Sequence, residues 1–164
     1  MELSSFFKKH PKVAVAFSGG VDSAYLLYEA AVNCADVCAY YVKSAFQPGF
    51  ELRDAMRLAK QLNTKLVVID ADVLAVSEIA ANPKNRCYYC KKLIFAKIKE
   101  QAAADGYTVL LDGTNASDDA ADRPGMRALE ELSVLSPLRE CGISKAEIRA
   151  RSKEAGLFTW DKPA

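Results

Sequence analysis

Short apolar segments rich in β-forming residues alternate with longer segments whose apolar positions are three or four residues apart. The first pattern is typical of buried strands and the second of amphipathic helices. The pattern predicts strands at residues 12–17, 37–42, 66–69 and 108–111, with a short fifth strand at 134–136. It predicts helices at residues 21–33, 50–62, 87–104, 124–132 and 144–155. The segment Ser-Lys-Ala-Glu at 144–147 predicts an N-cap and capping box at the start of the last helix. The expected apolar face of the second helix consists of Leu52, Met56, Ala59 and Leu62.

The alternation of strands and helices defines the fold class that we expect. Each helix would connect two parallel strands, which gives an α/β fold with a doubly wound parallel sheet and helices on both faces. No internal repeat or interdomain linker divides the sequence, so we expect residues 1–164 to form a single domain. Ligands of such sheets bind beyond the carboxyl ends of the strands. The loops of interest are those after Phe17, Val42, Leu111 and Ser136.

The composition excludes several classes of protein. Among the 164 residues, 22 Lys and Arg balance 21 Asp and Glu, and this near-neutral charge argues against nucleic acid as a partner. The apolar runs are far shorter than the about 20 residues of a membrane helix, and we see no secretory signal. The five cysteines are therefore expected to be reduced, in the cytoplasm. The single histidine, His10, excludes a zinc site with two histidines.

The segment Ser-Gly-Gly-Val-Asp-Ser at residues 18–23 joins the first predicted strand to the first predicted helix. Its glycines allow a sharp turn and a close approach of the backbone to a ligand. The N–H groups at the start of the helix, together with the helix dipole, favour an anion. The serine hydroxyls suit phosphate oxygens, and the carboxylate of Asp22 suits a Mg²⁺ ion that bridges to a phosphate. A tight strand–helix turn without a ligand is the alternative.

A second polar segment, residues 112–119, follows the fourth predicted strand. Gly113, Thr114 and Asn115 belong to it, and its side chains offer neutral hydrogen bonds. An acidic residue such as Asp118 could complete a Mg²⁺ site. Because parallel strands end at the same edge of a sheet, this loop would open onto the same crevice as the first one. A polar surface loop with Asx turns is the alternative.

The segment at residues 82–91 combines basic, aromatic and thiol side chains. Cys87 and Cys90 would share one face at the start of a helix, where neighbouring Arg and Lys favour a thiolate. Half a zinc site, a redox pair and two ordinary thiols are the interpretations, and zinc is disfavoured because no second Cys pair has matching spacing. For Cys34 and Cys38, core packing is the expected role.

The loop at residues 18–23 resembles the pyrophosphate loop of the ATP pyrophosphatase (PP-loop) superfamily, which includes NAD synthetase, GMP synthetase, asparagine synthetase and tRNA thiolation enzymes. This resemblance implies the fold of the adenine nucleotide alpha hydrolases, with ATP and Mg²⁺ as cofactors. The residues implied to bind ATP are Ser18, Gly19, Gly20, Val21, Asp22, Ser23, Gly113, Thr114 and Asn115. The implied metal ligands are Asp22 and Asp118.

Further motifs follow in order: Arg-Cys-Tyr-Tyr-Cys-Lys at 86–91, Asp-Gly-Thr-Asn at 112–115, Asp-Arg-Pro-Gly at 122–125, Ser-Pro-Leu at 136–138 and Trp-Asp-Lys-Pro-Ala at 160–164. Together they resemble the ATP-dependent sacrificial sulfur transferases of the LarE type, which build a nickel-pincer nucleotide cofactor. The resemblance implies catalytic roles for Asp22 and Lys162. It also implies substrate binding by Arg86, Arg123 and Arg139. Exposed surface positions without such a role are the alternative for Arg123, Arg139 and Lys162.

The resemblance implies an adenylylation reaction, in which a substrate carboxylate attacks the α-phosphorus of MgATP and pyrophosphate leaves. In this family the substrate is a dicarboxylated pyridinium mononucleotide, and a thiol later attacks the acyl-adenylate. An NAD-synthetase-like or amidotransferase-type ligase and a non-catalytic nucleotide-binding module are the alternatives.

The family's donor cysteine and C-terminal domain would follow Ala164, so we expect this chain by itself to adenylylate without completing sulfur transfer. The expected partner is a small-molecule nucleotide substrate rather than a membrane or a nucleic acid. A homo-oligomer is left open by the sequence.

Overall fold

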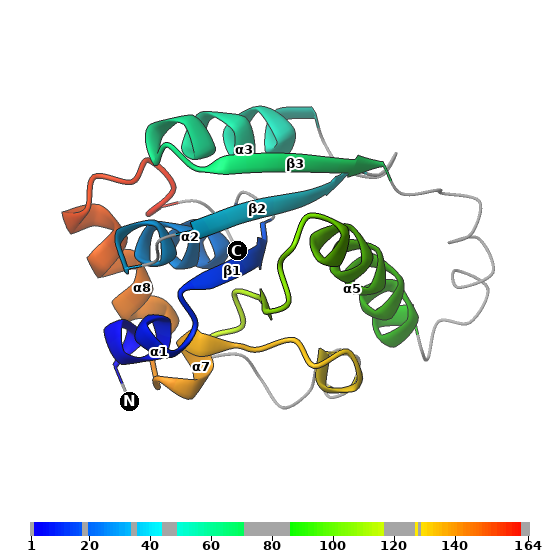
Figure 1. Cartoon of the computed structure of the whole chain (residues 1–164). Coiled ribbons are helices and arrows are strands. Elements are labelled where there is room, and N and C mark those ends of the chain that lie inside the picture. The colour runs from blue at the N-terminus through cyan, green and yellow to red at the C-terminus, as the bar shows by residue number, and fades with distance from the viewer. Residues whose placement is uncertain are drawn as a thin grey trace.

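A computed structural model describes residues 2–17, 20–33, 36–43, 49–70, 86–116, 127 and 129–161 (Figure 1). The helices are α1 (Leu3–Lys9), α2 (Val21–Asn33), α3 (Gly49–Gln61), α5 (Arg86–Ala104), α7 (Pro137–Glu140) and α8 (Lys145–Glu154). The strands are β1 (Lys12–Ala16), β2 (Asp36–Lys43), β3 (Lys65–Asp70) and β4 (Leu110–Leu111). The predicted strands and helices at these positions are confirmed, with ends that differ by at most two residues.

The strands of the described residues form one parallel sheet in the order β3-β2-β1-β4. Val15 in β1 pairs with Ala39 of β2 on one side and with Leu111 of β4 on the other. The chain winds outward from β1 to β3 and then crosses back to β4 on the opposite side of β1. The topological switch point therefore lies between β1 and β4, where a doubly wound sheet binds its ligands.

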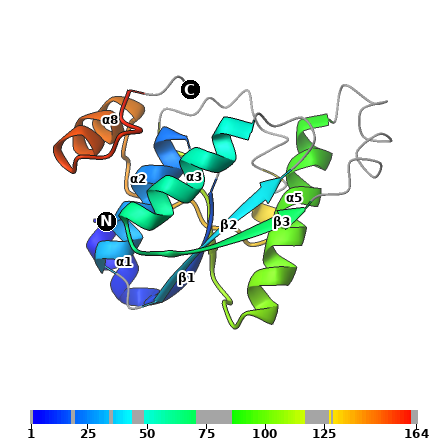
Figure 2. The ribbon, with the colours of Figure 1, turned by 90° about the horizontal axis from the view of Figure 1, so that it is seen from above.

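Helices cover both faces of the sheet, as the sequence predicts (Figure 2). Along β2, alternate side chains face opposite sides because successive residues of a strand point to opposite faces. Val37, Ala39 and Tyr41 pack in a core cluster with α1, α2, α3 and α8, whereas Cys38 and Tyr40 pack in a second cluster with α5. Strands buried on both faces explain why the sequence shows continuous apolar runs rather than alternation.

Several predictions of local structure are wrong or incomplete. Of the predicted apolar face of α3, Met56 is wrong because it is 55% exposed. Ala59 is buried and Leu52 and Leu62 pack against the core, as predicted, and Ala55 and Leu58 are buried in addition. The physical reason is that the face of α3 that packs in the core contains Ala55 and Leu58, and Met56 lies outside that face. The predicted fifth strand at 134–136 is reduced to one parallel bridge between Leu135 and Leu111.

Two short helices were not predicted. α1 buries Phe6 and Phe7 although it has no side-chain N-cap, and α7 has only four residues. In the predicted helix 124–132, the described helical residues are 127 and 129–131. The core role expected for Cys38 agrees with its burial, whereas Cys34 lies outside the described residues. Within the described ranges, no helix is long and apolar enough to span a membrane.

Candidate functional site

A cavity of about 390 Å³ lies at the carboxyl ends of β1, β2 and β4. One side of it is polar and comes from the first turn of α2 and from the loop after β4: Asp22, Ser23, Asp112, Gly113 and Thr114. The other side is largely apolar and comes from the strand ends and from α5: Ala16, Phe17, Tyr40, Tyr41, Val42, Ile94, Phe95 and Ile98. A cavity with one polar wall and one apolar wall suits a ligand that has a charged part and a flat apolar part.

The first turn of α2 forms part of the polar wall. The carbonyl of Gly20 accepts a hydrogen bond from the Ala24 amide at 3.0 Å, so the helix begins directly after the glycine pair. Ser23 is 5% exposed and lines the cavity, whereas the side chain of Val21 is buried in the core. Val21 can therefore contribute to binding only through its backbone. Ser18 and Gly19, predicted to bind ATP, lie outside the described residues.

Asp22 pairs with a lysine that is 123 residues away in the sequence. The Nζ atom of Lys145, the first residue of α8, donates to Oδ2 of Asp22 at 2.6 Å. About a quarter of each side chain is exposed, 27% for Lys145 and 24% for Asp22. The other carboxylate oxygen of Asp22, Oδ1, is buried and has no hydrogen-bond partner among the described residues. The pair therefore places one ammonium group and one carboxylate oxygen without a hydrogen-bond partner among the described residues at the start of α2.

Asp112 organises the loop after β4. Its two carboxylate oxygens accept hydrogen bonds from the hydroxyls of Thr114 at 2.6 Å and Ser136 at 2.5 Å. Asp112 is only 6% exposed, and its backbone amide bonds to the Leu135 carbonyl at 2.9 Å. This carboxylate thus ties the Gly-Thr-Asn loop to the segment that precedes α7. Asn115 is fully buried in the same loop.

Gly113 brings the loop after β4 into direct contact with the first turn of α2. A Cβ atom added to Gly113 would lie 2.9 Å from the backbone nitrogen of Ser23 and 3.2 Å from the Cβ atom of Asp22. No side chain larger than hydrogen fits at that distance, so the closeness of the two segments depends on this glycine. The prediction that the loops after the first and fourth strands share one crevice agrees with this contact.

Tyr40 borders the cavity and keeps its proton. Its hydroxyl donates to Oδ2 of Asp105 at 2.8 Å. Burial of the side chain is the main cause that raises the pKa of Tyr40 above its ordinary value, and the hydrogen bond to Asp105 is the second cause. The phenol is therefore neutral throughout the physiological pH range.

The remaining predicted site residues are not among the described residues that line the cavity at the strand ends. Arg139 lies on α7 and donates its backbone amide to the Thr114 carbonyl at 3.1 Å. It lines a separate cavity of about 170 Å³ with Ser136 and Glu130, not the larger one. Arg86 begins α5, and its side chain is not among those described. Like Ser18 and Gly19, the predicted site residues Asp118, Arg123 and Lys162 lie outside the described part of the chain.

Sequence reasoning missed two contributions to the site. Lys145 was interpreted only as part of a capping box, and the structure confirms the cap because Oγ of Ser144 accepts from the Glu147 amide at 3.3 Å. The available signal was that a lysine in the first turn of a helix is unfavourable beside the positive end of the helix dipole, which points to a contact outside the helix. The apolar wall from Ile94 and Phe95 had no signal, because these residues look like ordinary core positions of a helix.

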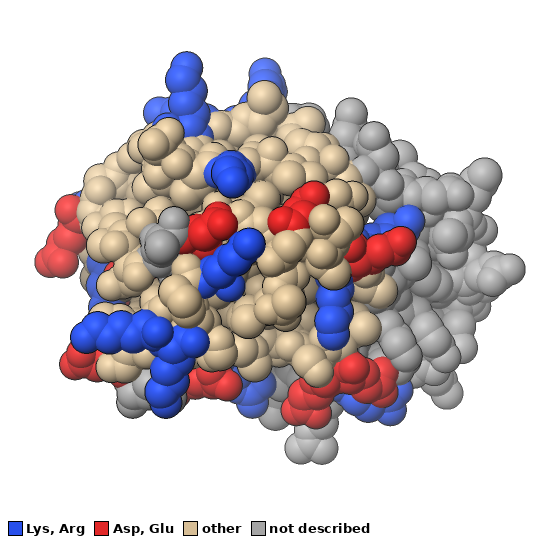
Figure 3. All heavy atoms as spheres, in the orientation of Figure 1, with Lys and Arg blue, Asp and Glu red and all other residues tan. Residues whose placement is uncertain are grey.

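Figure 3 shows that basic and acidic side chains are interspersed on the described part of one face. No broad surface of a single sign is visible in this view. This agrees with the formal net charge of +1, and a long polyanion is attracted less by such a surface than by a basic one.

The described part of the chain contains no metal site formed by side chains alone. No group of three His, Cys, Asp or Glu side chains there could hold a metal ion. Mg²⁺, however, is commonly bound by one or two carboxylates together with substrate phosphates and water. The unbonded Oδ1 atom of Asp22 fits that arrangement.

Comparisons with known proteins give several matches. The chain is 36% identical over 165 aligned positions to an uncharacterized protein of Synechocystis sp., covering 99% of the chain and 61% of that protein. It is 33% identical to the pyridinium-3,5-bisthiocarboxylic acid mononucleotide synthase of Lactiplantibacillus plantarum, covering 99% of the chain and 59% of the synthase. It is also 31% identical to the tRNA-specific 2-thiouridylase MnmA of Kocuria rhizophila, covering 93% of the chain and 50% of that enzyme.

Among solved structures, the NH3-dependent NAD synthetase from Campylobacter jejuni superposes with a TM-score of 0.72 at 17% identity, covering 95% of the chain and 71% of the synthetase. No protein-family model matches the chain. The chain spans about three fifths of the length of the first curated relatives, between 57% and 61%.

The fold is therefore the α/β fold of NAD synthetase, with a cavity at its switch point. With its sequence relatives taken into account, the chain belongs to the PP-loop ATP pyrophosphatase superfamily and is similar to the LarE-type synthase.

Proposed function

We propose that the chain is an ATP-binding domain that adenylylates a substrate carboxylate and releases pyrophosphate. The observation that carries this proposal is the meeting of the first turn of α2, Lys145 and the Gly113 loop at one end of the cavity. These groups supply backbone amides, one ammonium ion and hydroxyls, which are the donors that phosphate oxygens need. The apolar wall beside them accommodates a purine ring.

Each part of the cavity has a distinct role in this proposal. The amide of Ser23 and the dipole of α2 hold the pyrophosphate part of ATP. Lys145 neutralises charge on the phosphates, and the ring of Phe95 in α5 contacts the adenine. Oδ1 of Asp22 would be a ligand of Mg²⁺, whose chemistry is to neutralise the phosphate oxygens. Asp112 keeps the loop after β4 in place through Thr114 and Ser136.

In the chemical step the protein positions the substrate carboxylate and ATP, and it forms no covalent bond to either of them. An oxygen of the substrate carboxylate forms a bond to the α-phosphorus, and the bond from that phosphorus to the oxygen bridging to the β-phosphate breaks. The electron pair leaves with the pyrophosphate, so the products are an acyl-adenylate and pyrophosphate. Fixed positive charge at the leaving group lowers the barrier of such a step.

We propose sulfur transfer for a nickel-pincer nucleotide as the context of this reaction. The support is the 33% identity to the synthase of Lactiplantibacillus plantarum. The substrate would then be a dicarboxylated pyridinium mononucleotide. The chain matches 59% of that synthase, and the proposal for this chain is limited to the activation step.

The test is a product analysis with purified chain, MgATP and pyridinium-3,5-dicarboxylate mononucleotide. We expect pyrophosphate and the acyl-adenylate, which hydrolyses to AMP, and neither without the carboxylate. ADP and inorganic phosphate as the main products would contradict adenylylation.

A second candidate is tRNA thiolation, favoured by the 31% identity to MnmA. That activity would also form an adenylylated intermediate, but on RNA. Replacing the mononucleotide by tRNA in the same assay separates the two candidates, because only one of them should stimulate release of pyrophosphate. The near-neutral charge of the chain makes the small-molecule substrate our first choice.

A further inference from the structure

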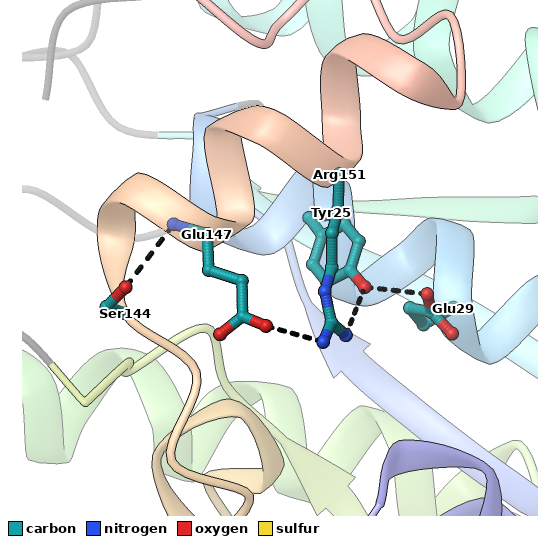
Figure 4. A network of polar contacts seen from close by, with 5 residues as sticks. All are labelled: Tyr25, Glu29, Ser144, Glu147 and Arg151. Atoms are coloured by element: carbon teal, nitrogen blue, oxygen red, sulfur yellow. Dashed lines mark hydrogen bonds and ion pairs between the residues drawn. The ribbon is translucent and has the colours of Figure 1, made fainter.

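A continuous line of polar contacts connects α8 to α2 (Figure 4). Arg151 of α8 donates from Nη1 to the hydroxyl of Tyr25 at 3.3 Å and from Nη2 to Oε1 of Glu147 at 2.6 Å. The Tyr25 hydroxyl donates in turn to Oε1 of Glu29 at 2.7 Å. The guanidinium thus joins Glu147 of its own helix to Tyr25 of α2, and the tyrosine hydroxyl extends the connection to Glu29.

The same two helices carry the Asp22–Lys145 pair. Asp22, Tyr25 and Glu29 are spaced three and four residues apart, so they form one stripe along α2. Lys145 and Arg151 both come from α8, six residues apart, which corresponds to about 9 Å along a helix axis. The helices therefore contact each other through two polar links, one at the cavity and one a turn and a half away.

The second link is rigid on the α2 side. Tyr25 is 1% exposed, and its ring is packed in the core. Burial raises the pKa of Tyr25 above its ordinary value, so its hydroxyl keeps its proton for Glu29 while it accepts from Arg151. Glu29 is held further by Asn33, whose Nδ2 donates to Oε2 of Glu29 at 3.1 Å.

We propose that Arg151 and Tyr25 are positioning residues for Lys145. A helix moves as a rigid rod over such short distances, so fixing Arg151 against Tyr25 also fixes where α8 begins. The start of α8 carries Lys145, whose ammonium group lies 2.6 Å from Oδ2 of Asp22 in this position of the helix. The planar guanidinium suits this task because its two nitrogens reach two different partners at once. This inference rests on the proposed function, in which Lys145 neutralises the phosphates of ATP.

The alternative is that the contacts stabilise the fold without affecting the site. Arg151 and Glu147 are 44% and 42% exposed, and exposed helix pairs contribute little to stability. A purely structural role would change the melting temperature but would leave the relative affinities for nucleotides unchanged.

The experiment measures affinities for MgATP and for AMP, which lacks the outer phosphates, by calorimetry. In Arg151→Met we expect the Kd for MgATP to rise about tenfold, equivalent to about 1.4 kcal/mol, while that for AMP changes less than about twofold. Tyr25→Phe keeps the ring and should give a smaller effect in the same direction. Arg127→Met, which also removes an i,i+4 pair with a glutamate, is the matched control and should change neither affinity.

A double-mutant cycle tests whether Arg151 acts through Lys145. If it does, Arg151→Met combined with Lys145→Met should bind MgATP no more weakly than Lys145→Met alone. Additive losses, or equal losses for MgATP and AMP in Arg151→Met, would overturn the proposal.

Hydrogen exchange without nucleotide separates this inference from the proposed function. The Ile148 amide donates to the Ser144 carbonyl at 2.9 Å in the first turn of α8. In Arg151→Met this amide should exchange about tenfold faster if the helix start is released, whereas the Leu62 amide at the end of α3 should be unchanged. Failure of the wild-type chain to bind MgATP would contradict the proposed function, and unchanged exchange at Ile148 would contradict the positioning role.

Discussion

Gly113 and Ser23 are in backbone contact although 90 residues separate them: a Cβ atom on Gly113 would lie 2.9 Å from the Ser23 nitrogen. One residue belongs to the loop after β4 and the other to the first turn of α2. The contact joins the loop after β4 and the first turn of α2, and both line the cavity. A feature that depends on the absence of a single methyl group can be tested by adding one.

Gly113→Ala should move the loop after β4 away from the first turn of α2. Because the new methyl group meets backbone rather than a flexible side chain, we expect the free energy of unfolding to fall by about 1–3 kcal/mol and the affinity for MgATP to fall at least about tenfold. Calorimetry and urea unfolding measure both quantities.

Gly142→Ala is the control for that change. A Cβ atom at Gly142 meets nothing within 4 Å, but its φ of +71° strains any other residue. We expect a loss of about 1–2 kcal/mol from this strain, with unchanged affinity for MgATP. Similar nucleotide affinities in both alanine variants would contradict the role assigned to the Gly113 contact.

Asp22→Ala should remove binding of MgATP while the fold persists. The ion pair with Lys145 is partly exposed, and such a pair contributes at most about 1 kcal/mol to stability. The far-UV circular dichroism spectrum should therefore stay the same, and the melting temperature should change little. Wild-type affinity for MgATP in this variant would show that Asp22 is not at the nucleotide site.

The protein should lose stability at alkaline pH because of buried tyrosines. Burial, together with hydrogen bonds to Asp105 and Asp36, raises the pKa values of Tyr40 and Tyr107. Their contribution is complete below the unfolded value of about 10 and is lost as the pH rises from there toward the folded values. The free energy of unfolding should fall by up to about 1.4 kcal/mol per pH unit for each tyrosine.

Urea unfolding at pH 8 to 11 measures this slope. Tyr40→Phe and Tyr107→Phe should each flatten it, because the substituted ring has no proton to lose. An unchanged slope in both variants would assign the alkaline sensitivity to other groups.

Two buried hydroxyls should be dispensable. Ser152 and Thr159 are fully buried, and neither hydroxyl has a hydrogen-bond partner in the described part of the chain. An unsatisfied buried hydroxyl is costly, so Ser152→Ala should raise the free energy of unfolding by about 1 kcal/mol. Thr159→Val should leave it unchanged or higher.

Ser136→Ala is the matched control for these hydroxyls. Its hydroxyl donates to the buried carboxylate of Asp112 at 2.5 Å, so its removal should cost about 2 kcal/mol. The order of the three variants in urea unfolding is the measurement. Destabilisation by Ser152→Ala as large as that by Ser136→Ala would mean that the Ser152 hydroxyl has a partner.

Local pattern was sufficient for most of the fold. The helix at 21–33 was predicted with its observed bounds because an apolar strand, two glycines and a periodic segment follow one another without ambiguity. The cap at Ser144 was predicted for the same reason, since capping depends on neighbouring residues alone. The helix α1 was missed because no capping side chain marks its start, and its apolar residues Leu3, Phe6 and Phe7 are buried only in the tertiary structure.

The sequence by itself determined the order of strands and helices, the placement of the Ser-Gly-Gly-Val-Asp-Ser and Gly-Thr-Asn segments at strand ends, and the membership of the superfamily. These features follow from interactions between residues close in the chain, or from motifs read directly. Only the tertiary structure brought Lys145 to Asp22, Gly113 to Ser23, and α5 to the apolar wall of the cavity. Contacts across 90 or more residues depend on how whole elements pack, and no local pattern carries that information.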